Sequence, residues 1–348
     1  MIRPLTSLRF FFAFFVFLSH LSFVKTNDIF YNWLKRNIFF EGYVGVSFFF
    51  ILSGFVLSYS YKTKFQNHKI TKKDFYIARF SRIYPLQFLT LLLAIPMICF
   101  YSSFQILPFL TNLFLVHSFI PKETFFFSFN APAWSISNEM FFYIIFPFLI
   151  LINNLKSIVY ILIPFLLILG IVLIPDDYHK TIFYVNPVIR SLDFILGILL
   201  YCLFSRKKFV SHFSTVKKAT ILEVLSLVIF LLFFIPHNIF IRGFRFSIYY
   251  WIPMCIIIYT FAQNKGLISK ILSNKTLVFL GEISFGFYMI HYLIISYGNI
   301  LNEKYTFNIN EILLCIIYFV ITFMLSCLSF IYYEKPMNTF IKKKLIKQ

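Results

Sequence analysis

Residues 310–333 read NEILLCIIYFVITFMLSCLSFIYY, a run in which Glu311 is the one charged residue. A helix of about 20 predominantly apolar residues crosses the bilayer core of about 30 Å. Backbone polar groups in hydrocarbon must be satisfied inside their own segment, so such a run is helical. This stretch therefore predicts a membrane-spanning helix, and similar runs recur along the chain.

The composition of the whole chain is that of a membrane protein. Of its 348 residues, 60% are hydrophobic and 13% are charged, whereas a soluble domain carries about 25% charged residues. A net charge of +19 would suggest nucleic-acid binding in a soluble protein. Here Lys and Arg lie mainly in short segments between apolar runs, which is typical of cytoplasmic loops. We therefore expect a lipid bilayer, and no nucleic acid, as a partner.

Eleven apolar runs are candidate spans: 5–24, 43–61, 84–101, 104–119, 134–152, 157–174, 188–204, 219–236, 246–262, 277–298 and 310–333. If all eleven crossed, the acidic loop 175–187 would be cytoplasmic and the basic loop 205–218 would lie outside, against the positive-inside rule. Treating 104–119, which contains Pro108, as a re-entrant or peripheral segment removes this conflict and places both termini in the cytoplasm. The predicted fold class is all-α, a polytopic transmembrane helical bundle of about ten spans that forms one integral-membrane domain over 1–348.

The first span contains two ionisable residues, Arg9 and His20. Ionisable groups inside a span are costly and by default mark functional sites. Their spacing equals three helical turns plus about 20°, so both side chains leave nearly the same face, about 16 Å apart along the axis. This face predicts a polar passage, with Arg9 toward the cytoplasm and His20 toward the outside. The alternative is an Arg that reaches the interface and an unrelated interfacial His.

A second candidate is the pair Arg79 and Arg82 in RFSRIYP at 79–85. Two guanidiniums one helical turn apart suit phosphate binding, because each presents a planar fork of donors. The alternative is ordinary positive charge beside a membrane span.

A third candidate is Ser135 with Glu139 in APAWSISNEMFFY at 131–143. Residues four apart share a helix face, and Glu139 is expected at a depth similar to that of His20. A carboxylate beside an imidazole raises its basicity and fixes its tautomer, as a general base requires. The alternative is a carboxylate favoured by the helix dipole near a helix start.

Weaker candidates are Arg190 with Asp193, which can also simply neutralise each other, and His291, which is either a site residue or a satisfied packing residue. His117, in the non-spanning run, has no assigned role. No set of His, Cys and carboxylate residues has metal-site spacing, and the five cysteines lack a C-x-x-C pair. We therefore expect no metal.

These residues together resemble the type 3 membrane acyltransferase family along the length of the chain. The matching motifs are an R-x10-H pair (Arg9, His20), a second-span signature (GYVGVSFFFILSGF, 42–55), an R-x-x-R pair (Arg79, Arg82), an S-x-x-x-E pair (Ser135, Glu139) and later motifs at 190–197 and 283–291. One departure is Ser47, where the family often has an acidic residue. A role for a carboxylate at that position is therefore in doubt.

The resemblance implies an O-acetyltransferase of the bacterial inner membrane, with acetyl-CoA as cytoplasmic donor and a hydroxyl of an envelope polysaccharide or lipid-linked glycan as acceptor. The implied site residues are His20, Glu139 and Arg9 for catalysis, Arg79, Arg82 and Arg9 for the donor, and Ser135, Arg190 and His291 for the acceptor. Direct attack by the sugar hydroxyl and an acetyl-His20 intermediate both remain open. So does the role of Arg9, at the donor or at the oxyanion. The alternative from another class is a transporter or flippase of a lipid-linked sugar, since intramembrane charges also mark transport pathways.

Overall fold

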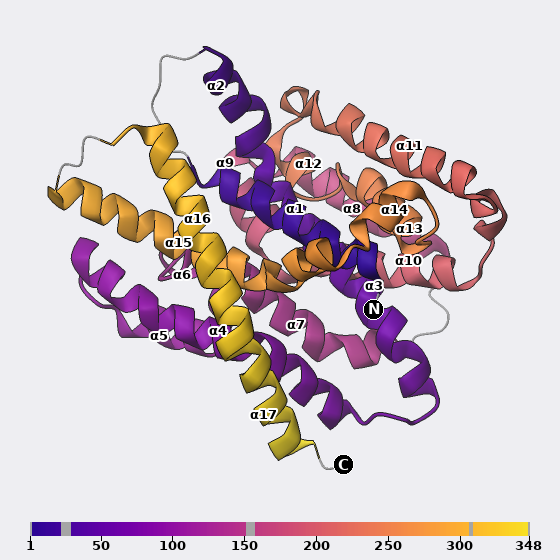
Figure 1. Ribbon diagram of the computed structural model, residues 1–348, viewed down its shortest axis with the longest axis horizontal. Coiled ribbons are helices and arrows are strands. Elements are labelled where there is room, and N and C mark those ends of the chain that lie inside the picture. Colours follow the sequence, from indigo (N-terminus) through magenta and orange to yellow (C-terminus); the bar gives the residue numbers. More distant parts are fainter. Residues whose placement is uncertain (1, 22–28, 151–156, 306–308, 347–348) are drawn as a thin grey trace. The chain divides into compact units, whose positions relative to one another are not determined.

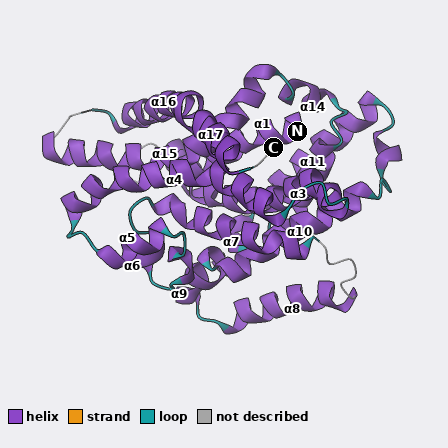
Figure 2. Cartoon of the chain, turned by 90° about the horizontal axis from the view of Figure 1, so that it is seen from below, coloured by secondary structure: helices purple, strands orange, loops and turns teal. Residues whose placement is uncertain are grey.

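The computed structural model describes residues 2–21, 29–150, 157–305 and 309–346, and every regular element in these ranges is helical (Figures 1 and 2). The ends of the expected spans 5–24 and 134–152 lie outside the described residues.

Ten helices coincide with the expected spans: α1 (Arg3–Ser19), α3 (Val44–Gln66), α4 (Lys72–Tyr101), α7 (Trp134–Leu149), α8 (Ser157–Leu173), α10 (Pro187–Ser205), α11 (Val216–Phe234), α13 (Trp251–Ala262), α15 (Lys275–Tyr305) and α16 (Glu311–Ser329). The other α-helices of the described ranges are α2 (Ile29–Leu34), α5 (Ile106–Leu113), α6 (Glu123–Phe126), α9 (Asp176–His179), α12 (Arg242–Phe246), α14 (Leu267–Leu272) and α17 (Lys335–Leu345). Short 3-10 and π-helical turns are η1 (Lys35–Phe39), η2 (Phe40–Tyr43), η3 (His117–Phe119), η4 (Ala131–Ala133), η5 (Lys180–Val185), η6 (Val210–Phe213), η7 (His237–Ile239) and η8 (Phe330–Glu334).

Helix lengths agree with a bundle of about ten spans. In the described part of the chain, seven helical segments are long and apolar enough to cross a membrane. The expected spans at α1, α7 and α8 have 17, 16 and 17 helical residues. Helix α5, inside 104–119, has 8 residues and is about 12 Å long at 1.5 Å per residue. This length confirms that the run does not span.

The helices extend beyond the apolar runs that predicted them. Helix α4 begins at Lys72 rather than at residue 84, so Arg79 and Arg82 lie inside it. Lys and Arg have good helix propensity, so the backbone stays helical where hydropathy has already fallen.

The contacts within the chain group into two units, each assembled from three separate segments: 1–9, 44–71 and 141–281 for the first, and 10–43, 72–140 and 282–348 for the second. The expected single domain over 1–348 stays a prediction.

Helices α3 and α10 pack closely in the first unit through two glycines. A Cβ atom on Gly54 would lie 2.0 Å from the carbonyl oxygen of Phe194, and one on Gly197 would lie 2.0 Å from that of Ile51. Both contacts are with backbone atoms, which cannot rotate away. The glycines of the motifs at 42–55 and 190–197 therefore set the separation of these two helices.

We expect Gly54→Ala to destabilise the protein by at least about 1–3 kcal/mol, the usual cost of overpacking. The measurement is the thermal unfolding temperature of the purified protein in detergent. The matched control is Gly170→Ala in α8, because a Cβ there would meet the Phe183 ring at 3.6 Å, an ordinary contact. Equal unfolding temperatures for the two variants would contradict the close packing of α3 on α10.

Aromatic packing in the second unit holds the C-terminal half of α1 against α15 and α16. The Phe17 ring lies 5.7 Å from the Phe287 ring and 6.0 Å from the Phe319 ring, centroid to centroid. These inclined arrangements are the favourable geometry for aromatic pairs. The end of α1, where His20 follows, is thereby placed beside α15.

Helix α17 packs antiparallel to the first half of α4, also in the second unit (Figure 1). Tyr333 Oη donates to the Pro85 carbonyl at 3.1 Å, and Ser81 Oγ donates to Asn338 Oδ1 at 3.2 Å. Because the later residue of the C-terminal segment pairs with the earlier residue of α4, the two helices run in opposite directions. The lysines that follow Asn338 therefore lie toward Arg79.

Candidate functional site

His20 lies directly after the last residue of α1, where its backbone N–H donates to the Phe17 carbonyl at 3.0 Å. The imidazole centroid is 5.1 Å from that of His291 and 5.3 Å from that of the Tyr292 ring, both on α15. His20 is partly exposed, whereas His291 is 0% exposed. Of the two residues, His20 is therefore the one with exposed surface.

A row of buried polar side chains continues from His291 toward α7. The Tyr288 ring lies 5.9 Å from the His291 ring, and Tyr288 Oη lies 2.8 Å from Ser135 Oγ. Both hydroxyls are within hydrogen-bonding distance of the Pro132 carbonyl, Ser135 at 3.0 Å and Tyr288 at 3.2 Å. The structure thus brings three predicted site residues, His20, His291 and Ser135, into one cluster, with Tyr288 as the link between the last two.

The turn before α7 is anchored at this cluster. Asn130 Nδ2 donates to the Met289 carbonyl of α15 at 2.9 Å, and Phe129 has φ 59°. A left-handed backbone at a non-glycine residue costs about 1–2 kcal/mol, so the surrounding contacts must enforce it. Such strained residues cluster at functional sites. His117, to which the sequence assigns no role, lies in η3, which precedes this turn in the chain, and is 0% exposed.

Glu139 lies on α7 one turn after Ser135 and is half-buried, as is Arg9 on α1. The ring contacts of His20 described above are with α15. The orientation of His20 by Glu139 therefore stays a prediction, and so does the role of Arg9.

A second cluster is cationic and lies where α17 packs on α4. Arg79 and Arg82 are partly exposed on α4, and Lys342 lies one turn after Asn338, the partner of Ser81. Partial burial, followed by the positive charges of Arg79 and Arg82, lowers the pKa of the Lys342 ammonium. Three neighbouring cations form a site that favours an anion such as phosphate. The sequence did not single out Lys342, because it lies some 260 positions from the arginines in the chain and resembles the other tail lysines.

Arg190 is buried in the first unit and is engaged by protein groups. Its Nη2 lies 3.0 Å from Asp193 Oδ2 and donates to Ser47 Oγ at 2.8 Å, its Nη1 donates to the Phe246 carbonyl, and its guanidinium lies 5.1 Å from the Phe50 ring. This arrangement supports mutual neutralisation of Arg190 and Asp193. Ser47, where the sequence departs from the family pattern, accepts a hydrogen bond from Arg190 without carrying a charge. Asp193 supplies the carboxylate that neutralises Arg190.

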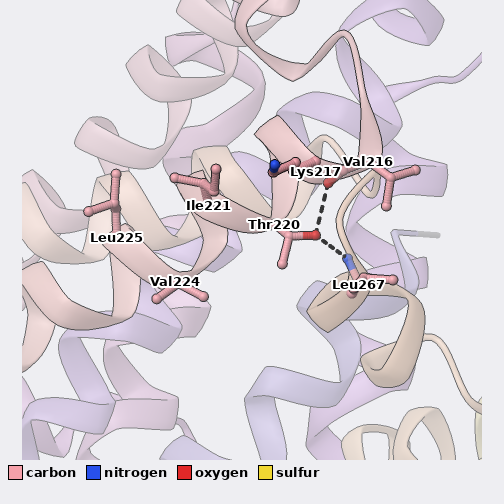
Figure 3. Close-up of a pocket in the computed structure, with 7 residues that line it drawn as sticks. All are labelled: Val216, Lys217, Thr220, Ile221, Val224, Leu225 and Leu267. Carbon is pink, nitrogen blue, oxygen red and sulfur yellow. Dashed lines mark hydrogen bonds between the residues drawn. The ribbon is translucent and has the colours of Figure 1, made fainter.

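A shallow cavity of about 450 Å³ between α11 and α14 contains no candidate catalytic group (Figure 3). Its wall is mostly aliphatic, including Ile221, Val224 and Leu267, and Thr220 bridges the two helices by accepting from Leu267 N at 2.9 Å. Within the described ranges, no group of three or more His, Cys, Asp or Glu is placed to hold a metal ion. The expected independence from metal stays a prediction.

The fold and the histidine cluster define an integral-membrane protein with a polar site among its helices. The family model described as an acyltransferase domain, that of the type 3 acyltransferases, matches residues 5–331. The chain therefore belongs to this family, as its motifs predicted, and is an acyltransferase.

Relatives with curated descriptions match most of the chain. Acyltransferase MdmB of Streptomyces mycarofaciens is 29% identical over 85% of this chain and 79% of its own length. Peptidoglycan O-acetyltransferase OatA of Listeria monocytogenes is 26% identical over 88% of this chain and 52% of its own length. Putative peptidoglycan O-acetyltransferase YrhL of Bacillus subtilis is 23% identical over 91% and 53%. The chain thus spans about half the length of the last two, and no solved structure matches it significantly.

Proposed function

We propose that this protein transfers an acetyl group from cytoplasmic acetyl-CoA to a hydroxyl of an envelope polysaccharide or lipid-linked glycan. The observation that carries the proposal is the position of the partly exposed His20 at the end of a membrane helix, where its imidazole packs against a buried second imidazole at 5.1 Å. Family membership supports acyl transfer over the transporter alternative. The relatives described as O-acetyltransferases support acetyl as the group and an envelope glycan as the acceptor.

The proposed reaction uses His20 as general base. Its ring takes the proton of the acceptor hydroxyl, the alkoxide oxygen bonds to the thioester carbonyl carbon, and the carbon–sulfur bond breaks to release coenzyme A, which regains the proton from His20. In the second route, a His20 ring nitrogen attacks the thioester carbonyl carbon, the carbon–sulfur bond breaks, and coenzyme A leaves with the proton of the other ring nitrogen. The acceptor hydroxyl then attacks the acetyl carbon, the bond to the ring nitrogen breaks, and the imidazole regains a proton from the hydroxyl. Glu139 would orient His20, and Arg9 would stabilise the donor or the oxyanion.

The donor and acceptor sites follow the same proposal. Arg79 and Arg82, joined by Lys342, would bind the phosphates of the donor at the cytoplasmic face, and the acyl arm would run along α1 past Arg9. The acceptor would bind from outside, near Ser135. Arg190, which the resemblance places at the acceptor, would act by fixing α10 against α3 within the first unit. The protein would lie in the bacterial inner membrane with both termini in the cytoplasm.

The proposal is tested with bacteria that carry or lack the gene, by NMR of their surface glycan. We expect O-acetyl signals only with the gene, on a glycan of unchanged sugar composition. Loss of the glycan itself from the surface, without a change in acetylation of the remainder, would instead support a transporter.

We expect Arg82→Ala to raise the KM for acetyl-CoA about tenfold, the equivalent of about 1.4 kcal/mol, because one charge-assisted phosphate contact is lost at a partly exposed site. The KM is measured in isolated membranes at saturating acceptor. The control is Lys73→Ala, since Lys73 is an exposed cation at the start of the same helix. An unchanged KM for Arg82→Ala would remove Arg82 from the donor site.

A further inference from the structure

The hydrogen bonds of His291 define which of its nitrogens carries the proton. Nδ1 lies 3.2 Å from the Phe287 carbonyl oxygen, one turn earlier on α15. A carbonyl can only accept, so Nδ1 carries the hydrogen and Nε2 of the neutral ring carries a lone pair. This Nε2 is buried and has no hydrogen-bond partner among the described residues.

An unpaired buried acceptor is unusual, because leaving one unsatisfied costs about 1–3 kcal/mol. Of the rings that contact His291, those of Phe17 and Phe287 are apolar, and the Tyr288 hydroxyl is within hydrogen-bonding distance of Ser135. The His20 ring, by contrast, lies 5.1 Å away between centroids. At this centroid distance, two imidazoles whose nitrogens face each other can form a hydrogen bond of about 3 Å between nitrogens.

We propose that His291 is a positioning residue for His20, accepting a hydrogen bond at Nε2 from one His20 ring N–H. The other His20 nitrogen is then fixed as the lone-pair nitrogen that faces the acceptor hydroxyl. This inference rests on the proposed function and deepens it. It gives His291, which is 0% exposed, an indirect role in place of the direct substrate contact that the resemblance implies.

The second contact of His20 is consistent with this role. The Tyr292 ring packs edge-on against His20 at 5.3 Å and 76°, while Phe287 and Tyr288 flank His291 on the same helix. Residues 287 to 292 of α15 therefore supply both the proposed hydrogen-bond acceptor and an aromatic ring that packs against His20. In catalytic histidine sites, a second side chain that hydrogen-bonds to the imidazole fixes the orientation of this general base before the substrate binds.

The test compares His291→Leu with His291→Gln in membranes supplied with acetyl-CoA and glycan acceptor. Leu removes the nitrogen acceptor, whereas the Gln side-chain oxygen can replace it. We expect Leu to lower kcat about 100-fold with the KM for acetyl-CoA unchanged, and Gln to restore kcat to within about tenfold of wild type. If His291→Leu does not accumulate, His291→Met, also without a nitrogen acceptor, takes its place.

Thermal unfolding of the same proteins separates positioning from packing. A packing role predicts that the apolar Leu is at least as good as Gln in both stability and kcat. Wild-type kcat in His291→Leu, or equal kcat in the two variants, would therefore overturn the inference while leaving the His20 mechanism intact. A wild-type protein that transfers no acetyl group to glycan would instead overturn the proposed function, and this inference with it.

Discussion

His20→Ala is expected to abolish acetyl transfer while the protein still accumulates in the membrane. As general base, the imidazole contributes about 10²–10⁴-fold to the rate, and as acetyl carrier its loss removes the route altogether. Folding should survive, because His20 follows the end of α1 and is partly exposed. The measurement is label transferred from acetyl-CoA to glycan by membranes with matched amounts of protein.

The control for this variant is His212→Ala, which removes an exposed histidine of η6 and should leave the rate unchanged. Labelled glycan at wild-type levels from His20→Ala would exclude His20 from the mechanism. A protein that no longer accumulates would show that His20 stabilises the end of α1 instead.

Arg190→Met is expected to destabilise the protein by about 3–5 kcal/mol, the cost of removing one partner from a buried ion pair. Asp193 is 1% exposed and lies 3.0 Å from Arg190. Without the guanidinium, the buried carboxylate would keep the hydrogen bond from Trp251 Nε1 but would lose its counter-charge, so it would either remain as an uncompensated charge or take up a proton. Thermal unfolding in detergent measures the loss.

The double variant Arg190→Met/Asp193→Leu is the control for this prediction. Replacing both partners by apolar residues is often neutral or stabilising, so we expect it to recover most of the lost stability. Recovered acetyl transfer would show that Arg190 acts through the packing of α10. Recovered stability without activity would support a contact with the acceptor. Equal instability of single and double variants would contradict the ion-pair account.

Hydropathy located the spans, because the requirement for about 20 apolar residues is a property of the bilayer and is visible in any sequence. The positive-inside rule alone identifies the segment around α5 as non-spanning, and the structure gives it an 8-residue helix. The sequence could not predict where helices such as α4 begin. Hydropathy marks only the apolar part of a helix, whereas the helical backbone of α4 begins earlier and includes Lys72 and Arg79.

The candidate site was predicted in its ionisable members and in Ser135, but not in its tyrosines. His20 and Arg82 stand out because ionisable groups are rare in and beside spans, but Tyr288 and Tyr292 do not stand out among 22 tyrosines. Their roles depend on which face of α15 meets α1, and this depends on Phe packing that no local pattern specifies. Lys342 was missed for the same reason, since only the packing of α17 on α4 brings it to the arginines.

The most direct test of acetyl transfer from the cytoplasm to the outer face uses membrane vesicles of both orientations and acetyl-CoA labelled in its acetyl group. In inverted vesicles, whose cytoplasmic face is accessible, we expect label on the enclosed glycan, and none in sealed right-side-out vesicles. His20→Ala should remove the signal. Absence of labelled glycan in inverted vesicles with wild-type protein and acceptor present, or labelling only from the outer face, would contradict the account.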